Sequence, residues 1–373
     1  MQQKVTKIPT LIETNYAKSV WCDEILNGIG KKRYSVISFD DLGKYEENSV
    51  VVVIGTTNSF FKNAVRACRK RNLRALLVGA EFTDFGTRAS SIKTDRIDAI
   101  SSFVKYLHSN KRDKIALFGI DKFSAKDLEK KEAFIETMKE LDLPKPHKHI
   151  YYYNENFQNT LNDIFKNISD YNSVICSNDY FAVAFIIEAA KRGVSVPDDI
   201  FVTGYGNTYI GEKICPSLTT IAPKYYELGR QASRIYAHLA DNADITSLEL
   251  FIDYDMIIRK STDNRTLTKS RHDEIFEADP NINNMFDDKE VKPIIGLDSI
   301  LSLPDKSLIK ILDSISNDES YNYIAEKLYL SDSAFRYKLN KIFGFTGASS
   351  KKELKELRDS ITLENYDIEH TND

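Results

Sequence analysis

The chain lacks the features of secreted, membrane-spanning and disulfide-bonded proteins. Its 373 residues include four cysteines, which stand singly, and no CxxC pair occurs. Scattered cysteines of this kind are typical of free thiols in a reducing compartment. The first residues contain no apolar core of a signal peptide, and no apolar run approaches the ~20 residues that a membrane helix needs. These absences predict a cytoplasmic protein that makes no use of a membrane.

The motifs of common catalytic and phosphate-binding sites are also missing. The sequence has no GxSxG, HExxH, Walker A or GxGxxG pattern. Gly28 and Gly30 follow an expected helix rather than a strand, so they do not form a phosphate-binding loop. None of the six histidines stands in a context typical of a catalytic triad. We therefore expect no enzymatic activity, no cofactor and no metal site.

The balance of charge excludes a protein that is basic throughout. Lysine and arginine number 51 against 55 acidic residues, which gives a net charge of −4. A basic face on one domain remains compatible with this total, because affinity for DNA depends on local charge. The length predicts two or three domains.

From about residue 7 to 258, short apolar runs alternate with longer amphipathic segments, which predicts an α/β fold. Several runs are continuously apolar, as in parallel strands that helices cover on both faces. The units are too many for one ordinary open sheet, so two sheets side by side are expected. Strands are expected at Ile8–Ile12, Val50–Ile54, Ala75–Val78, Ile115–Gly119, Ile150–Tyr153, Val174–Cys176 and Ile200–Gly204, and helices at about 18–30, 58–72, 94–109, 126–141, 156–169 and 179–193.

The alternation ends after residue 262. The stretch RHDEIFEADPNINNMFDDKE is acidic and rich in asparagine, so residues 263–295 are expected to form an exposed linker. Residues 296–362 show a wholly helical pattern, and residues 363–373 are expected to be a disordered tail. The organisation is thus an α/β unit over 1–262, a linker, and an all-α domain.

Two short helices joined by a tight turn are predicted in YNYIAEKLYLSDSAFRYKLNKI, which begins at Tyr321. Ser331 can cap the second helix, which Gly344 and Gly347 are expected to end. Its apolar positions, at i, i+4 and i+7, face a core, and its polar positions face away from it. Arginine and asparagine suit base edges and lysine suits phosphates. The residues expected to contact DNA are Ser333, Arg336, Tyr337, Lys338, Asn340 and Lys341.

The pattern IAEKLYLSDSAFRYKLNKIFGFTGASSKKEL resembles the LuxR-type DNA-binding domain. The resemblance implies a four-helix domain that contains a helix-turn-helix, with Arg336, Tyr337 and Asn340 facing bases. Because the domain offers few contacts to phosphate, one copy is expected to bind DNA weakly and in a salt-sensitive way. A homodimer that places two recognition helices on one DNA site is therefore expected. An alternative is that these helices mediate dimerisation or other protein contacts and that their basic face is merely solvated.

The segment SVICSNDYFAVAFIIEAAKRGVSVPDDIFVTGYGNTYIGEKICPSLTTIAPKYYELGRQA closely resembles the effector-binding domain of the LacI/GalR repressors, itself similar to periplasmic sugar-binding proteins. The resemblance implies two Rossmann-like lobes of the periplasmic-binding-protein type, with a cleft between them and three crossing strands. It places lobe N at about 1–110 and 223–243 and lobe C at about 111–222 and 244–262. In that family the DNA-binding segment precedes the sensor. Here the C-terminal helices are expected to take that role.

By the same resemblance, a small-molecule effector, a sugar or another metabolite, is expected to contact Asn15, Tyr16, Asp95, Lys130, Asn178, Asn207 and Tyr225. Lys130 stands where the family has an arginine, and Gly206 and Asn207 stand at its acidic turn. Lysine does not reproduce the paired contacts of arginine, which favours a ligand other than a typical sugar, or a sensor that is only a dimer platform. Alternatively, Asp95 and Asn178 simply cap helices and the tyrosines only pack.

Taken together, these patterns predict a cytoplasmic transcription regulator that binds double-stranded DNA as a homodimer under the control of a ligand-sensing unit. The alternative is a small-molecule-binding or dimerisation protein whose C-terminal helices contact other proteins.

Overall fold

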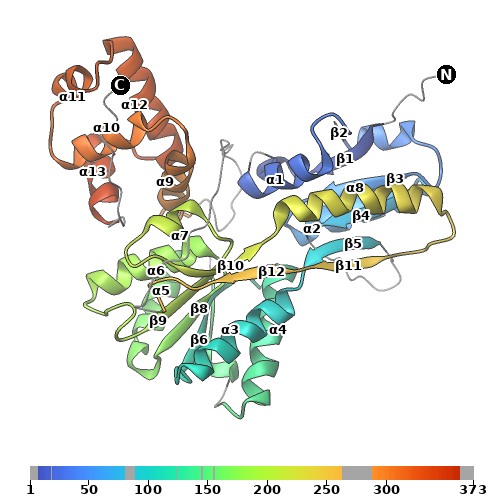
Figure 1. The fold of residues 1–373 in the computed structure, drawn as a ribbon, viewed down its shortest axis with the longest axis horizontal. Helices are drawn as coiled ribbons and strands as arrows, with labels where there is room; N and C mark the ends of the chain where they lie inside the picture. Colours follow the sequence, from blue (N-terminus) through green and yellow to red (C-terminus); the bar gives the residue numbers. More distant parts are fainter. Residues whose placement is uncertain are drawn as a thin grey trace.

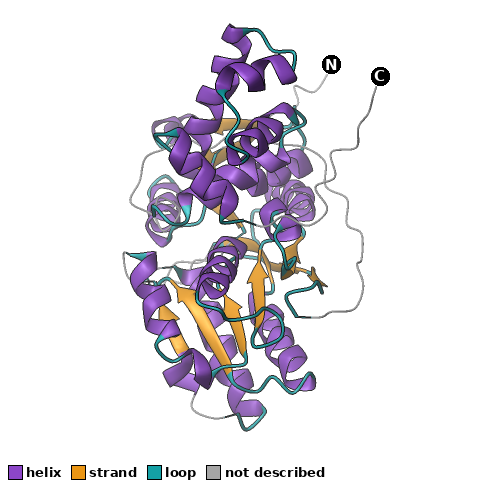
Figure 2. Ribbon diagram, turned by 90° about the vertical axis from the view of Figure 1, so that its left-hand side faces the viewer, coloured by secondary structure: helices purple, strands orange, loops and turns teal. Residues whose placement is uncertain are grey.

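The chain forms two α/β lobes followed by a unit made only of helices (Figure 1). The computed structural model describes residues 7–17, 19–79, 89–122, 124–143, 146–153, 156–262 and 288–361. Within these ranges, no helix combines the length and the apolar character that crossing a bilayer requires. The two predicted α/β lobes are confirmed, because the strands form two separate sheets. Figure 2 shows strands sandwiched between helices beneath the helical unit.

Lobe N is built on a six-stranded parallel sheet with the order β11-β5-β4-β3-β1-β2. Alternate residues of β3 point to opposite faces, as the pleat of a strand requires. Val52 packs with the core under α1 and α8, whereas Val51 and Val53 pack against α2. The elements are β1 Ile8–Ile12, η1 Thr14–Tyr16, α1 Val20–Ile29, β2 Tyr34–Ile37, η2 Asp40–Lys44, β3 Val50–Ile54, α2 Asn58–Arg69, β4 Arg74–Val78, β5 Ser90–Thr94, α8 Tyr225–Asp241 and β11 Glu249–Ile252.

Lobe C repeats this plan with the strand order β12-β10-β9-β8-β6-β7, in which only β12 runs antiparallel to its neighbour. Ile115 and Leu117 of β6 pack towards α3 and α4, and Phe118 packs towards α5 and α6. The elements are α3 Arg96–Ser109, β6 Ile115–Ile120, α4 Ala125–Glu140, η3 Pro146–His149, β7 Ile150–Tyr152, α5 Phe157–Phe165, η4 Ile168–Asp170, β8 Ser173–Cys176, α6 Asp179–Lys191, β9 Phe201–Tyr205, α7 Tyr209–Lys213, β10 Thr219–Pro223 and β12 Tyr254–Ile257.

The chain crosses between the lobes at three places, near Asp95, Lys224 and Asp253. Two of these crossings are tied together, because Lys224 Nζ lies 3.3 Å from Asp253 Oδ2 and 3.1 Å from Asp255 Oδ1. The first crossing precedes the boundary predicted near residue 110, since α3 packs against α4 in lobe C. The third follows the boundary predicted near 243, since β11 pairs with β5 in lobe N.

The C-terminal unit consists of helices α9 Lys292–Ser302, α10 Ser307–Ser316, α11 Tyr321–Lys327, α12 Asp332–Thr346 and α13 Lys351–Asp359. The predicted helical region is thus present. Ser331 caps α12 as predicted, because its hydroxyl accepts from the backbone N–H of Ala334 at 3.3 Å. Gly344 does not end α12, which continues to Thr346 and stops at Gly347, where φ is +69°. A glycine tolerates this left-handed conformation without a Cβ clash.

Helix α9 corrects the prediction of a linker that extends to residue 295. It lies between lobe C and α12 (Figure 1), and most of its apolar residues are buried. One continuous hydrophobic core contains Phe157 and Ile210 of lobe C, Leu297 of α9, and Leu312 and Ile342 of the helical unit. The run PIIGLDSILS carries enough apolar side chains to join two cores. The helical unit is therefore packed onto lobe C rather than tethered to it.

Candidate functional site: the interlobe residues and helix α12

The residues predicted to bind a ligand lie mostly at the carboxyl ends of strands, where the two lobes face each other. Asp95 follows β5, Asn178 follows β8, Asn207 follows β9, and the segment with Asn15 and Tyr16 follows β1. Ligands of open parallel sheets bind at this end of the strands. We call this region the interlobe site. The side chain of Asn15 lies outside the described part of the structure.

Several of the predicted ligand residues already have partners within the protein. Asn178 Oδ1 accepts from the backbone N–H of Phe181 at 3.0 Å, and Asp95 Oδ1 accepts from that of Asp98 at 3.0 Å, so the capping roles are confirmed. Asn207 Oδ1 accepts from Arg259 Nη2 at 2.7 Å. These side chains shape the site through bonds to their own lobe.

Lys130 is buried and is held inside lobe C. Its Nζ donates to Asp127 Oδ1 at 2.9 Å and to the carbonyl oxygen of Ser177 at 2.7 Å. It also lies 4.7 Å from the centre of the Tyr205 ring. Burial raises the pKa of the Tyr205 hydroxyl to about 12. The hydrogen bonds and the ring contact hold the Lys130 side chain beside strand β9.

Aromatic rings line the lobe N side of this region. The ring centre of Trp21 lies 6.0 Å from that of Tyr16 and 6.4 Å from that of Tyr225. These spacings are typical of aromatic pairs that pack together. Tyr16 and Tyr225 thus do pack as aromatics, and burial raises the pKa of the Tyr225 hydroxyl.

Residues that the sequence reading did not single out make the contacts between the lobes. Lys126 of α4 donates to the carbonyl oxygen of Gly55, after β3, at 3.3 Å. Arg96 donates from Nε to Glu129 Oε2 at 2.8 Å and from Nη1 to the carbonyl oxygen of Gly79, after β4, at 3.4 Å. Two weak signals in the sequence were Lys126 standing four residues before Lys130, on one helical face, and Arg96 following Asp95 directly.

Lys126 is the most perturbed cation of the interlobe site. Its partial burial removes it from bulk water and lowers the pKa of its ammonium to about 7, and repulsion from Arg96 and Lys130 adds to the effect. Attraction to Glu13 and Asp127 opposes the shift. Charged and neutral forms of Lys126 are therefore both populated near neutral pH.

Helix α12 presents one polar face to solvent. Phe335, Leu339 and Ile342 are buried in the helical core, as predicted. The opposite face carries Ser333, Arg336, Tyr337 and Asn340, all of them exposed. Their spacing of three and four residues places them on one stripe of the helix. Arg336 Nε lies 3.0 Å from Asp332 Oδ2, an exposed pair whose contribution to stability is small.

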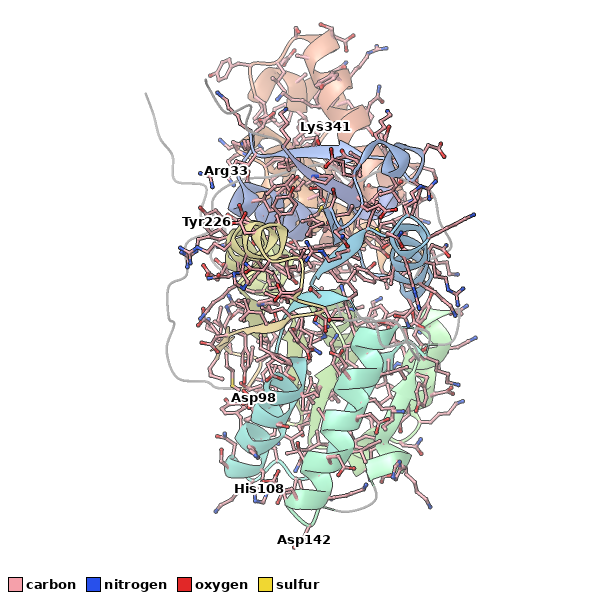
Figure 3. The ribbon with its side chains drawn as sticks, turned by 90° about the vertical axis from the view of Figure 1, so that its right-hand side faces the viewer. Arg33, Asp98, His108, Asp142, Tyr226 and Lys341 are labelled. Carbon is pink, nitrogen blue, oxygen red and sulfur yellow. The ribbon has the colours of Figure 1, made fainter. Side chains whose placement is uncertain are left out.

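The two remaining residues predicted to contact DNA lie at the edges of this stripe. Lys338 forms an ion pair with Asp305, and its side chain is only 20% exposed. Lys341 Nζ lies 5.6 Å from the centre of the Phe345 ring. Figure 3 shows Lys341 in the helical unit and His108 and Asp142 at the opposite end of the molecule. Lys338 is therefore less accessible to a partner than the sequence suggested.

A buried carboxylate joins α9 to lobe C. Asp298 Oδ1 accepts from the backbone N–H of Ile210 at 2.6 Å, and its Oδ2 accepts from the Tyr180 hydroxyl at 3.1 Å. Nearby, Asp288 Oδ2 accepts from the backbone N–H of Phe157 at 2.9 Å. The sequence signal was a single aspartate within the apolar run of α9.

The stability contribution of Asp298 is expected to depend on pH. Burial raises the pKa of its carboxyl from 3.8 to about 6. Between these values the folded chain binds more protons than the unfolded chain, so the contribution is complete below pH 3.8 and is lost as the pH rises through 6. A shift of about two units corresponds to about 3 kcal/mol. Urea unfolding of wild type and Asp298→Asn across this pH window measures the contribution of Asp298 to the free energy of unfolding. A difference in unfolding free energy between the two chains that does not vary with pH would contradict the prediction.

Comparison with known proteins relates part of the chain to periplasmic-binding-protein-like domains. A family model described as periplasmic binding protein-like domain matches residues 104–262. The HTH-type transcriptional repressor CytR of Escherichia coli is 32% identical over 90 residues, which are 24% of this chain and 26% of CytR. The NTD biosynthesis operon regulator NtdR of Bacillus subtilis is 27% identical over 176 residues, which are 45% of this chain and 52% of NtdR. The chain thus spans about a quarter to a half of these relatives.

Solved structures show the same fold over the two lobes. The transcription regulator CcpA of Lactococcus lactis has a TM-score of 0.58 at 19% identity, and the match covers 69% of this chain and all of that one. The CelR–cellobiose complex has a TM-score of 0.59 at 14% identity, covering 69% of this chain and 84% of that one. At these identities the likeness establishes the two-lobed fold alone.

Proposed function

We propose that this chain is a DNA-binding transcription regulator in which the two lobes sense a small molecule and helices α11 and α12 form a helix-turn-helix. The observation that carries the proposal is the exposed polar stripe of α12, with Ser333, Arg336, Tyr337 and Asn340 at helical spacing. The opposite side of the same helix is fully packed. The proposal is also supported by CytR and NtdR, which are similar to part of this chain and are named as a transcriptional repressor and an operon regulator.

The geometry of α11 and α12 suits a reader of the major groove. Four residues, 328–331, connect the helices, a turn length typical of helix-turn-helix motifs. The second helix of such a motif enters the groove with its first turns against base edges. Arg336 and Asn340 can contact guanine and adenine, Tyr337 can face the bases beside them, and Ser333 can donate to a phosphate. The LuxR-type assignment is part of this proposal, supported by the order of α10 to α13.

The first turn of α6 offers a path from the interlobe site to α12. Asn178 caps the helix at that site. Asp179 accepts from the backbone N–H of Thr208 at 2.7 Å, just before α7, and burial raises its pKa. Tyr180 donates to Asp298 of α9. A ligand that changes how the lobes meet would thus act on α9, and through it on α12.

The regulator would act as a homodimer in the cytoplasm. One α12 stripe offers few cations to phosphates, and two copies on one DNA site would multiply the contacts. The predicted ligand residues belong to the same proposal: they would shape the effector site rather than all contact the ligand, since most are already bonded within their lobes.

One observation favours a second function for the helical unit. Tyr323, Tyr329 and Tyr337 are 54%, 97% and 68% exposed, and tyrosine is enriched where proteins meet. In this alternative the helices contact another protein and bind no DNA. Substitutions of Arg336 and Asn340 distinguish the two functions, because contact with bases requires these side chains and the alternative does not.

Replacing Arg336 with alanine is expected to weaken binding to a duplex selected by the wild-type chain by about 1–3 kcal/mol, or roughly ten- to a hundredfold, because a base contact is lost. Fluorescence anisotropy at fixed salt measures this. The matched control is Lys352→Ala, which removes the same charge from an 85% exposed side chain on α13. Equal binding by wild type and Arg336→Ala would contradict the assignment of α12 as the recognition helix.

A further inference from the structure

The carboxylates of the interlobe site are already satisfied by the protein's own donors. Glu13 Oε2 accepts from the backbone N–H groups of Thr56 at 2.7 Å and Thr57 at 3.1 Å, and its Oε1 accepts from the Thr57 hydroxyl at 2.5 Å. Asp127 accepts from the backbone N–H of Asp121 at 3.1 Å as well as from Lys130. These acids therefore do not require donors from a ligand.

The cations of the same site have donors to spare. Arg96 is 5% exposed, and its Nε and Nη1 are bonded. Its Nη2 has no hydrogen-bond partner among the residues that the structure describes, and the Tyr205 hydroxyl lies close to the guanidinium. A buried donor without an acceptor is destabilising, so a ligand that accepts from it gains binding energy. Lys126 reaches the Gly55 carbonyl at 3.3 Å, which is longer than the ~2.7–2.9 Å of a strong charge-assisted bond. A ligand of the interlobe site would therefore be held by acceptor atoms that bind these two donors.

An aromatic surface lies next to these donors. Lys126 Nζ is 5.5 Å from the centre of the Trp21 ring, and Trp21 lies between Tyr16 and Tyr225. Planar groups pack favourably on such rings. Lobe C thus supplies positive charge and lobe N supplies flat apolar surface to the same place.

We propose that the interlobe site binds a small organic anion whose carboxylate or phosphate oxygens accept from Arg96 Nη2 and Lys126 Nζ and whose carbon skeleton lies against Trp21. A hydroxyl of a neutral polyol could accept one of these bonds, but it carries no negative charge to attract the two cationic side chains. An ionised group brings acceptors only. The inference rests on the proposed function, because it takes the interlobe site to be the place where the effector binds. The anion would bridge the lobes where Lys126 and Arg96 now contact Gly55 and Gly79.

Trp21 allows a direct test, because it is the single tryptophan of the chain. The full chain is titrated with phenyl phosphate, benzoate and the neutral benzyl alcohol at constant ionic strength, and tryptophan fluorescence is followed. Saturable changes are expected with at least one anion, with an apparent affinity at least tenfold above that for benzyl alcohol. The tighter of the two anions identifies phosphate or carboxylate as the preferred group.

Variants tie the signal to the proposed donors. Lys126→Gln is expected to weaken anion binding at least tenfold, and Lys126→Arg, which keeps the charge, to restore most of it. The control Lys139→Gln alters an exposed lysine of the same helix and should titrate like wild type. The inference is overturned by benzyl alcohol binding as tightly as the anions, by no saturable change with either anion, or by Lys126→Gln titrating like wild type. Binding of the wild-type chain to selected DNA, measured in parallel, tests the proposed function separately.

Discussion

Alanine at position 296 is expected to destabilise the C-terminal helices by about 3 kcal/mol, the upper end for overpacked contacts. Gly296 lies where α9 crosses α12. A Cβ at this position would stand 2.2 Å from the backbone oxygen of Phe345 and 2.8 Å from the Cα of Thr346. Backbone atoms cannot rotate away as side chains can, so the two helices must separate.

A second glycine provides the matched control for this substitution. Gly344, in α12, has nothing within 4 Å of a Cβ added to it. Gly344→Ala should leave stability unchanged or raise it by up to ~1 kcal/mol, because alanine favours a helix over glycine. Urea unfolding followed by circular dichroism compares the two chains. Equal stabilities would contradict the close packing of α9 against α12.

Replacing Asp298 with alanine is expected to loosen the helical unit from lobe C. The change leaves the Ile210 N–H and the Tyr180 hydroxyl without their acceptor, at a cost of roughly 1–3 kcal/mol for each buried group. Residues two apart on a helix point about 200° apart, so Asp298 faces lobe C while Gly296 faces α12. Contacts among α10 to α13 should therefore survive, and only their attachment to lobe C should weaken.

Hydrogen exchange measures this loosening residue by residue. The Ile210 amide and the amides of α9 should exchange faster in Asp298→Ala, while Leu339 and Ile342 of α12 should stay protected. The control Asp163→Ala removes an exposed aspartate of α5 that forms an ion pair with Lys166, the residue after that helix. Unchanged exchange at Ile210 would show that Asp298 does not hold α9 to the sensor.

The sequence predicted strands that form short apolar runs and missed strands whose residues make no such run. Val50–Ile54 is apolar throughout and matches β3, because both of its faces are buried. Ser90–Thr94 is also buried but carries serine, lysine and threonine, so β5 has no apolar pattern to detect. Glu249–Ile252 is largely exposed at a sheet edge. Missing these two strands misplaced the boundaries between the lobes.

Only those parts of the sites that follow from local sequence patterns could be predicted. The caps at Asp95 and Asn178 and the inward stripe of α12 follow from helix geometry and were found. Contacts between Lys126 and Gly55, or between Asp298 and Ile210, join residues that are 71 and 88 positions apart. No periodic pattern encodes such pairs, because they depend on how the lobes and helices pack. For the same reason the pairing of Lys338 with Asp305 was not foreseen.

Selection of duplexes from a random DNA pool by the full-length chain tests the central claim most directly. If α12 reads bases, the wild-type chain should enrich a recurring sequence over successive rounds. A chain with alanine at Arg336, Tyr337 and Asn340 should enrich none, although its packed residues Phe335, Leu339 and Ile342 are intact. Failure of the wild-type chain to enrich any sequence, or the same enriched sequence with both chains, would contradict the account.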